Sequence, residues 1–403
     1  MRLRLVNGIC SRSGQITSRF LSRSCLSLNQ KTSQQQEYLE EYKIRTLLER
    51  PIEHYSRKKF APVSLSTLVN QSQQLDQEFI MKNARDSVER LLAFTARGLK
   101  EFRKLPYLVV LNPSISQGYQ TYLQSMTLLL NSTLKFPTTI EENEMFTEKY
   151  INGFLNLHSD TLPSLSKGFN EVLSLLSEQK VKTFLDNHLR ERISMRLIAH
   201  QHVCLTNTFN DKSKFEPGSS YNGTVQPLDI VAVIKKNADL INDIFFLKYD
   251  QTIPIEFETD KSAIIFPYIE YHLDYIFSEL FKNSFRSQVE ANILDPVLVT
   301  IVSSDTDLQI RIRDKGKGIP ESVLNHIFDY SFTTFDNEEG DSYKTLNVPP
   351  GDAGNVVAGM GYGLPLLMNY IETFNNEDTI SGLLALQTYP GCGTDIYLKI
   401  KVV

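Results

Sequence analysis

Four short segments in the second half of the chain carry residue types that could bind a nucleotide. In the first, HLDYIFSELFKNSFRS, the polar residues Glu279, Lys282, Asn283 and Arg286 are spaced three, four and seven residues apart. On a helix this spacing places them on one face. A carboxylate can accept a proton, an ammonium group can bind phosphate, and a carboxamide can offer an oxygen to Mg²⁺. The alternative is the ordinary polar face of a surface helix.

The second segment, DKGKGIP, directly follows a predicted strand at Leu308–Ile312. Asp314 could accept a hydrogen bond from the amino group of adenine. Gly316 and Gly318 would form a tight turn where backbone can approach a flat ligand. Taken alone, a simple hairpin turn explains this segment better.

The third and fourth segments are also rich in glycine. In GMGYGLPLL, Gly359, Gly361 and Gly363 lead into a helical pattern, and exposed N–H groups at a helix start can bind phosphate. In GCGTDIYLKI, Thr394 lies at a turn before a predicted strand. The spacing is neither the dinucleotide-binding pattern GxGxxG nor the P-loop pattern, so neither of those sites is predicted.

The order of the four segments resembles the ATP site of the GHKL class, the nucleotide-binding fold that histidine kinases use. The order is E-x-x-K-N on a helix, then D-x-G-x-G, then G-x-G-x-G, then G-x-G-T, all within residues 279–394. Each segment is weak evidence by itself, whereas the ordered set is specific. The resemblance implies ATP as the nucleotide.

The elements that must position these segments differ between the two halves of the chain. Residues 37–235 are helical in pattern, with helices expected at Gln73–Phe94, Ser116–Leu130, Leu165–Leu176 and Val181–Leu205. The segment 206–227, rich in Asn, Ser, Gly and Pro, is expected to be a linker. Strands are expected at Ile253–Phe257, Leu298–Ile301, Leu308–Ile312, Leu383–Thr388 and Ile396–Val402, with helices near 267–290 and 363–375.

These patterns predict an α + α/β fold, an N-terminal helix bundle followed by an α/β sandwich of the GHKL type. The expected domains are a leader at 1–36, the bundle and linker at 37–227, and the ATP-binding domain at 228–403. The polar stretch 335–358 is too long for an ordinary connection and is expected to be a lid over the nucleotide.

Composition and charge narrow the class of protein further. The net charge of −5 argues against a surface that coats nucleic acid, and no apolar run is long enough to span a membrane. Residues 1–36 contain five arginines and one lysine but no acidic residue, which is typical of a mitochondrial transit peptide. A disordered basic tail is the alternative. The four cysteines form no CxxC pair and suggest no disulfide framework.

The chain also resembles a narrower family, the mitochondrial pyruvate dehydrogenase kinases and the related branched-chain 2-oxo acid dehydrogenase kinase, most of all the fungal pyruvate dehydrogenase kinases. ELFKNSFRS, IRDKGKGIP, FDYSFTT, GMGYGLPL and GCGTDIYLK are similar to the ATP-site sequences of that family, and FLDNHLRERISMRLIAHQH and KLPYLVVLNP to its bundle helices. The resemblance implies a general base at Glu279, a Mg²⁺ ligand at Asn283 and an adenine acceptor at Asp314. The full set of implied ATP-site residues is Glu279, Lys282, Asn283, Arg286, Asp314, Gly316, Gly318, Ser331, Thr333, Gly359, Met360, Gly361, Tyr362, Gly363, Leu364 and Thr394.

The sequence departs from this family in two places. Animal pyruvate dehydrogenase kinases carry a histidine four residues before the glutamate, where this chain has Tyr275, as the branched-chain enzyme does. The animal enzymes also end in an Asp-Trp pair that supports the dimer and the binding of the lipoyl domain, and this chain has no tryptophan. The first departure bears on the choice of substrate, the second on how the kinase grips its complex.

The predicted function is therefore a mitochondrial-matrix serine kinase that uses ATP and Mg²⁺ and inactivates the pyruvate dehydrogenase complex. The implied partners are the E1 α subunit, the lipoyl-bearing E2 core and a second kinase subunit in a homo- or heterodimer. The alternatives are a kinase of the branched-chain complex and a non-kinase ATPase that changes conformation. A histidine kinase using His200 or His202 is a third possibility.

Overall fold

The computed structural model describes residue 43 and residues 45–159, 161–259, 263–330, 361–376 and 379–401. The chain divides into two compact units, Met1–Arg50 and Pro51–Val403, and the second unit contains both the helical region and the sheet. The predicted leader at 1–36 and the predicted lid at 335–358 lie outside the described residues. Within the described residues, no helix is both long enough and apolar enough to cross a membrane.

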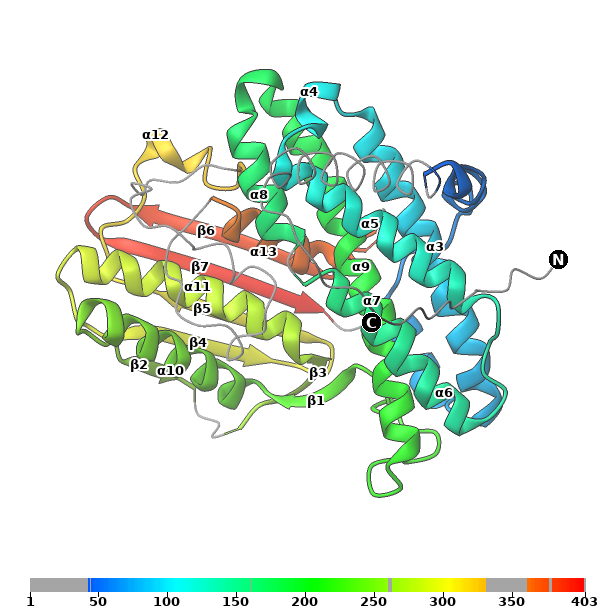
Figure 1. The fold of residues 1–403 in the computed structure, drawn as a ribbon. Coiled ribbons are helices and arrows are strands. Elements are labelled where there is room, and N and C mark those ends of the chain that lie inside the picture. Colours follow the sequence, from blue (N-terminus) through cyan, green and yellow to red (C-terminus); the bar gives the residue numbers. More distant parts are fainter. Residues whose placement is uncertain are drawn as a thin grey trace, which may run out of the picture. The chain divides into compact units, whose positions relative to one another are not determined.

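The N-terminal part of the second unit is a bundle of helices (Figure 1). Three long helices form its centre, and the core between them contains the fully buried Leu91, Leu99 and Phe102. The helices are α2 (Leu65–Gln73), α3 (Gln77–Lys104), α4 (Tyr107–Val110), α5 (Pro113–Ser132), α8 (Thr161–Glu171) with the 3₁₀ turn η2 (Leu173–Leu175), and α9 (Glu178–Asn210). The predicted bundle is confirmed.

The first predicted helix has a different extent in the structure. Instead of one helix at Gln73–Phe94, α2 ends at Gln73 and α3 begins at Gln77. The break comes at Asp76, whose side chain accepts a hydrogen bond of 2.7 Å from the backbone N–H of Phe79 and caps α3. The helical spacing of apolar residues continues across the break, so the sequence pattern predicted one helix where the structure has two.

A further helical run between α5 and α8 was not predicted. It consists of α6 (Ile140–Phe146), the π-helix η1 (Thr147–Asn152) and α7 (Gly153–Leu157). Thr139 caps its start, because the hydroxyl accepts a hydrogen bond from the backbone N–H of Glu142. The run packs against both α5 and α9 and so completes the bundle.

The predicted linker 206–227 is wrong at both ends. Helix α9 continues to Asn210, because Thr206 is buried and accepts a hydrogen bond from the Asn143 side chain. The strand β1 (Val225–Asp229) then begins inside the predicted linker and pairs antiparallel with β3 (Ile265–Ile269). Pro227 lies opposite Pro267 in this two-stranded ladder; the β1 segment was predicted to be linker, and the end of β3 was predicted to be the start of a helix.

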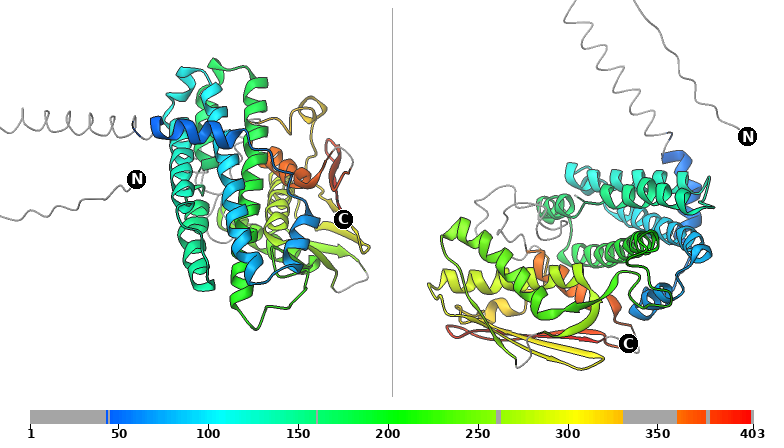
Figure 2. Two further views of the ribbon diagram at one scale, coloured as in Figure 1. Left: turned by 90° about the vertical axis from the view of Figure 1, so that its right-hand side faces the viewer. Right: turned by 90° about the horizontal axis from the view of Figure 1, so that it is seen from below.

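The C-terminal part is a five-stranded mixed sheet with helices on one face (Figures 1 and 2). The strand order is β2-β4-β5-β7-β6, with β2 and β4 parallel and the other neighbours antiparallel. The strands are β2 (Ile255–Glu258), β4 (Val297–Ser303), β5 (Asp307–Arg313), β6 (Gly382–Tyr389) and β7 (Gly393–Lys401). All five predicted strands are present, and the α/β sandwich is confirmed.

The helical layer consists of α10 (Ile230–Tyr249), α11 (Glu270–Glu290) and α13 (Gly363–Ile371), the last followed by η4 (Glu372–Phe374). A short helix, α12 (Glu321–Leu324), follows β5. Helix α10 was not predicted, and α11 begins at Glu270 rather than at the predicted residue 267, where the chain is still in β3. On β5, Leu308, Ile310 and Ile312 are buried toward this layer, as their alternation predicted.

Candidate nucleotide site

The polar residues of α11 lie in different environments. Glu279 is buried, with 8% of its surface exposed, and Lys282 forms an ion pair with its Oε1. Asn283 is exposed, and within the described chain its carboxamide has no hydrogen-bond partner. Arg286 is buried at 7% exposure. The predicted helix is present, so the four residues have the helical spacing that the sequence indicated.

The start of α13 lies directly against this group. A side chain at Gly363 would overlap Oε2 of Glu279, so the glycine leaves room for this carboxylate at the start of α13. Gly361, two residues earlier, has a φ of +74°, which favours glycine. The third segment is thereby placed at the carboxylate of the first.

Asp314 joins the second segment to the fourth. Its Oδ1 accepts hydrogen bonds from the backbone N–H groups of Gly316, at 2.9 Å, and Thr394, at 3.2 Å. Its own backbone N–H donates to the carbonyl of Thr394 at 3.0 Å. Asp314 is 4% exposed, and burial raises the pKa of its carboxyl group to about 6, while the two backbone N–H groups act in the opposite direction.

The glycines of these turns are fixed by close contacts with neighbouring backbone. Gly318 has a φ of +67°, and a side chain there would overlap the carbonyl oxygen of Tyr389. Gly393 has a φ of +95°, and a side chain there would overlap the carbonyl oxygen of Asp314. A side chain at Gly316 would meet the hydroxyl of Ser287 on α11. All four segments therefore meet in one region between α11, α13 and the ends of β5 and β6.

Some predicted site residues cannot be placed, and others were missed. Ser331, Thr333, Gly359 and Met360 lie outside the described residues. Tyr362 is fully buried, and Leu364 is half-buried. The structure adds Ser287, Thr388 and Tyr330.

Each of the added residues touches one of the predicted segments. The hydroxyl of Thr388 accepts from the backbone N–H of Ile319 at 2.8 Å and lies 3.1 Å from the hydroxyl of Thr394. The ring of Tyr330 lies 5.6 Å from the ring of Tyr362, between centroids. Of the three added residues, only Thr388 could have been found from the sequence, through the cross-strand register that pairs it with Thr394.

His272, two turns before Glu279 on α11, is a packing residue. His272 is completely buried among Tyr268, Tyr271, Tyr370 and Phe374, and burial lowers its pKa to about 3. Its ring is therefore neutral at physiological pH. Tyr275, one turn before Glu279, places its ring 4.8 Å from that of Tyr370.

The two histidines of the bundle do not have the surroundings of a phosphorylated histidine. His202 is completely buried, and its ring nitrogens lie 2.8 Å from Oδ1 of Asn83 and 3.1 Å from the hydroxyl of Thr147. Burial lowers the pKa of His202 and of His200 to about 4. His200 packs its ring on Tyr271 at 5.1 Å. Both histidines serve the packing of α9.

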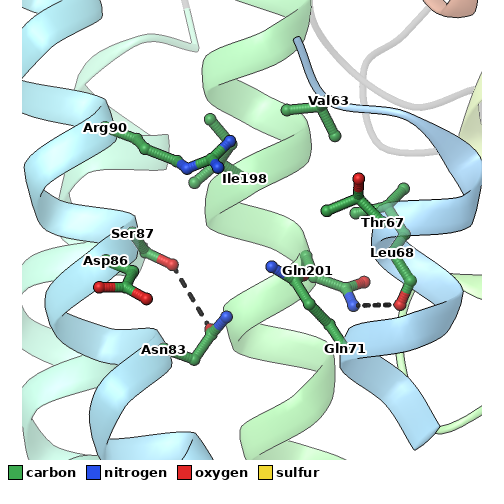
Figure 3. Close-up of a pocket in the computed structure, with 10 residues that line it drawn as sticks. All are labelled: Val63, Thr67, Leu68, Gln71, Asn83, Asp86, Ser87, Arg90, Ile198 and Gln201. Atoms are coloured by element: carbon green, nitrogen blue, oxygen red, sulfur yellow. Dashed lines mark hydrogen bonds between the residues drawn. The ribbon is translucent and has the colours of Figure 1, made fainter. Parts of the chain in front are cut away.

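A small pocket lies in the bundle, between α2, α3 and α9 (Figure 3). Some of its polar groups are bonded to other protein groups: Ser87 bonds Asn83, and the Gln201 side chain bonds both the carbonyl of Leu68 and the backbone N–H of Thr224. The pocket is formed by bundle residues alone and is separate from the region where the four glycine- and acid-bearing segments meet.

The fold and the assembled segments define a GHKL-type ATPase domain joined to a helix bundle. Residues 269–403 match the family described as histidine kinase-, DNA gyrase B- and HSP90-like ATPase. Residues 62–226 match the family described as mitochondrial branched-chain alpha-ketoacid dehydrogenase kinase. The two matches cover the sheet domain and the bundle separately.

Whole-chain relatives are mitochondrial protein kinases. The chain is 32% identical to mitochondrial pyruvate dehydrogenase (acetyl-transferring) kinase 1 of Saccharomyces cerevisiae over 371 residues, which covers 89% of each chain. It is 28% identical to isozyme 4 of the human and of the mouse kinase, covering 88% of this chain and 84% of each relative. The chain belongs to the family of mitochondrial pyruvate dehydrogenase kinases. It is accordingly an ATP-using protein kinase of the mitochondrial matrix.

Proposed function

We propose that this chain is a protein serine kinase that phosphorylates the E1 α subunit of the mitochondrial pyruvate dehydrogenase complex and so inactivates it. The observation that carries the proposal is the identity to the yeast pyruvate dehydrogenase kinase over nearly the full length, bundle included. The convergence of Glu279, Gly363, Asp314 and Thr394 in one region supports it from the structure.

In this proposal Asp314 recognises adenine. Its Oδ1 is held by the backbone N–H groups of Gly316 and Thr394, so the carboxylate is fixed in direction before any ligand arrives. Its other oxygen is then the acceptor for the amino group of adenine. Gly316 and Gly318 line the pocket, and Thr394 lies beside the base. A group held in place by backbone bonds loses little conformational entropy on binding.

The raised pKa of Asp314 predicts that nucleotide affinity depends on pH. Adenine binds the ionised carboxylate, so affinity should fall as pH drops through about 6. The contribution of Asp314 to the free energy of unfolding should change in the opposite direction, and so be larger at low pH. The folded pKa lies above the ordinary value of about 3.9, so stability due to this group is greatest below that value and falls as pH rises to about 6.

This dependence can be measured by calorimetric titration of ADP between about pH 5 and pH 7, compared with Asp314→Asn. The phosphate groups of ADP titrate equally against both proteins, so the difference between the two curves isolates Asp314. The variant should bind more weakly, and the extra loss at low pH should be absent. Parallel curves for both proteins would contradict the assignment.

Glu279 is proposed as the general base for the substrate serine, supported by Lys282. The ion pair with Lys282 and the contact with Gly363 hold the carboxylate at the start of α13. Gly361 and Gly363 are proposed to present backbone N–H groups to the phosphates, where the dipole of α13 also favours negative charge. Arg286 is buried one turn beyond Asn283, and its positive charge is proposed to contribute to ATP binding from the protein interior.

Asn283 is the proposed ligand of Mg²⁺. Its carboxamide is exposed, without a protein partner in the described chain, and one turn from Glu279, which fits an ion that takes one or two protein oxygens and completes its shell with water and phosphate. When bound, the ion would supply positive charge that offsets the charge developing on the phosphates, and Asn283 would hold it there. The described residues contain no cluster of three His, Cys, Asp or Glu side chains that could hold it instead.

The partners are proposed from the relatives. The E1 α subunit would be the substrate, the lipoyl-bearing E2 core the docking platform, and a second kinase subunit the dimer partner. The sequence contains no tryptophan, so it offers no Asp-Trp pair like the one at the C-terminus of the animal enzymes, and the residues that would contact the lipoyl domain are not assigned.

Two alternatives share the same ATP site. The branched-chain complex is a possible substrate, since the bundle matches that family and Tyr275 occupies the position of the catalytic-site histidine. A conformational ATPase would bind ATP without transferring phosphate to protein. Incubating the purified kinase with γ-labelled ATP and each purified complex distinguishes them. Label on pyruvate dehydrogenase E1 α and loss of its activity are expected; label on the branched-chain E1 alone, or on neither, would refute the proposal.

The leader is proposed to direct import. Fusing residues 1–36 to a reporter that is otherwise cytosolic should send the reporter into mitochondria, because a basic segment without acidic residues is drawn across the inner membrane. A matched fusion with Arg2, Arg4, Arg12, Arg19 and Arg23 changed to glutamine should stay cytosolic. Fluorescence microscopy and fractionation give the readout, and a wild-type fusion that remains cytosolic would refute the assignment.

A further inference from the structure

A ring of hydrogen bonds, closed through the backbone of α9, joins this bundle helix to Tyr330 and to Asn369 in the last turn of the nucleotide-site helix α13. The hydroxyl of Tyr330 donates to Oδ1 of Asp186 on α9 at 2.6 Å and accepts from Nδ2 of Asn369 on α13 at 3.0 Å. Oδ1 of Asn369 accepts from Nε of Arg190 at 3.1 Å. Asp186 and Arg190 lie one turn apart on α9, so the ring closes on that helix.

One member of this hydrogen-bonded network, Tyr330, contacts the glycine segment. The centroid of its aromatic ring lies 5.6 Å from that of Tyr362, which is fully buried and stands between Gly361 and Gly363 in the sequence. Nδ2 of Asn369 also donates to the carbonyl of Pro365 in the first turn of α13, at 3.1 Å. Of the two residues that α9 holds, Tyr330 therefore contacts the glycine segment through Tyr362, and Asn369 reaches back to the first turn of α13 through Pro365.

The residues at the centre of this hydrogen-bonded network are shielded from solvent, whereas the ion pairs that flank it are exposed. Asn369 is 4% exposed and Tyr330 is half-buried. Burial, and then the hydrogen bond to Asp186, raise the pKa of Tyr330 well above its usual value, so the phenol remains a donor at physiological pH. The flanking pairs Arg190–Glu372 and Lys182–Asp329 lie at the surface, where ion pairs contribute little.

We propose that Tyr330 is a positioning residue through which the bundle sets nucleotide affinity. It holds the glycine segment at the start of α13 in the geometry that binds phosphate, and Asp186 of α9 in turn fixes its hydroxyl. The inference rests on the proposed nucleotide site. Coupling of this kind is reciprocal, so nucleotide should also make the N-terminal half of α9 more rigid.

The change Tyr330→Phe tests this, because it removes both hydrogen bonds and keeps the ring against Tyr362. We expect the Kd for ADP to rise about tenfold, within the range of roughly 5–150-fold typical of coupled sites. The KM for ATP should rise in parallel while kcat stays close to that of the unmodified kinase, since Glu279 is untouched. Tyr397→Phe is the matched control, because Tyr397 also donates to an aspartate, Asp395, but from β7. Its ADP affinity should not change.

A second measurement separates positioning from simple destabilisation. Hydrogen–deuterium exchange of the backbone of residues 182–190 should slow when ADP binds the unmodified kinase, and this slowing should be absent in Tyr330→Phe at saturating ADP. Asp186→Leu, which is similar in size but removes the acceptor of the Tyr330 hydroxyl, should weaken ADP binding in the same direction. If Tyr330→Phe is poorly folded, this variant carries the test.

The outcomes are distinct. An ADP affinity within about twofold of the unmodified kinase in Tyr330→Phe, or an equal loss in Tyr397→Phe, would overturn the positioning role. Unchanged protection of α9 by ADP in Tyr330→Phe would overturn it as well. Absence of ADP binding by the unmodified kinase would instead refute the nucleotide site on which the inference rests.

Discussion

Replacing Glu279 with glutamine is expected to lower the rate of E1 phosphorylation by about 10²–10⁴-fold while leaving ATP affinity nearly unchanged. Glutamine keeps the size of the side chain and an acceptor for Lys282, but it cannot take a proton from the substrate serine. A loose transition state for phosphoryl transfer asks less of a base than of positioning, so the lower end of this range is the more natural expectation. Single-turnover transfer to E1, together with calorimetric titration of ATP, measures both quantities.

Two further variants define what the Glu279 result means. Glu270→Gln changes a glutamate in the first turn of the same helix, paired with Lys236 at the surface, and should leave transfer unchanged. Asn283→Ala removes the proposed metal ligand and should weaken Mg²⁺-dependent nucleotide binding and transfer together. Normal transfer by Glu279→Gln would show that the base assignment is wrong. Loss of ATP binding in that variant would place Glu279 in the nucleotide site instead.

Replacing Asp314 with alanine is expected to produce the largest loss of nucleotide binding. Loss of a hydrogen bond to a charged group costs roughly 1.5–3 kcal/mol, which corresponds to about 10–150-fold in Kd. The backbone N–H groups of Gly316 and Thr394 would also lose their shared acceptor, so the turn that lines the pocket would loosen.

The control for this variant lies at the other end of the same strand. Asp307 begins β5 and pairs with Lys399 at 3.4 Å, far along the strand from the turn, and Asp307→Ala should bind ATP normally. Circular dichroism and thermal unfolding show whether each variant is folded. A folded Asp314→Ala that binds ATP with unchanged affinity would remove Asp314 from the adenine pocket.

The sequence by itself determined the class of fold and the ligand of the site. Each of the four segments combines its residue types within a few positions of chain, where helix period, strand alternation and the backbone freedom of glycine operate. That is why the face of α11, the end of β5 at Asp314 and the glycine turns before α13 and β7 could be predicted. The strands of the large sheet were predicted for the same reason.

Features that depend on distant partners could not be read from the chain. Strands β1 and β3 each contain a proline, and only their pairing with each other makes them strands. The burial of Arg286, and the contacts of Ser287 with Gly316 and of Thr388 with Thr394, follow from how α11 and β6 approach the turns.

The connection between the two halves was decided by tertiary structure alone. Asp186 and Tyr330 are distant in sequence, and neither belongs to a pattern that announces a partner. A hydrogen bond forms where two elements meet, and that meeting is set by the packing of α9 against α13 as a whole. Local spacing encodes which side chains share a face, whereas the identity of the facing surface depends on the complete fold.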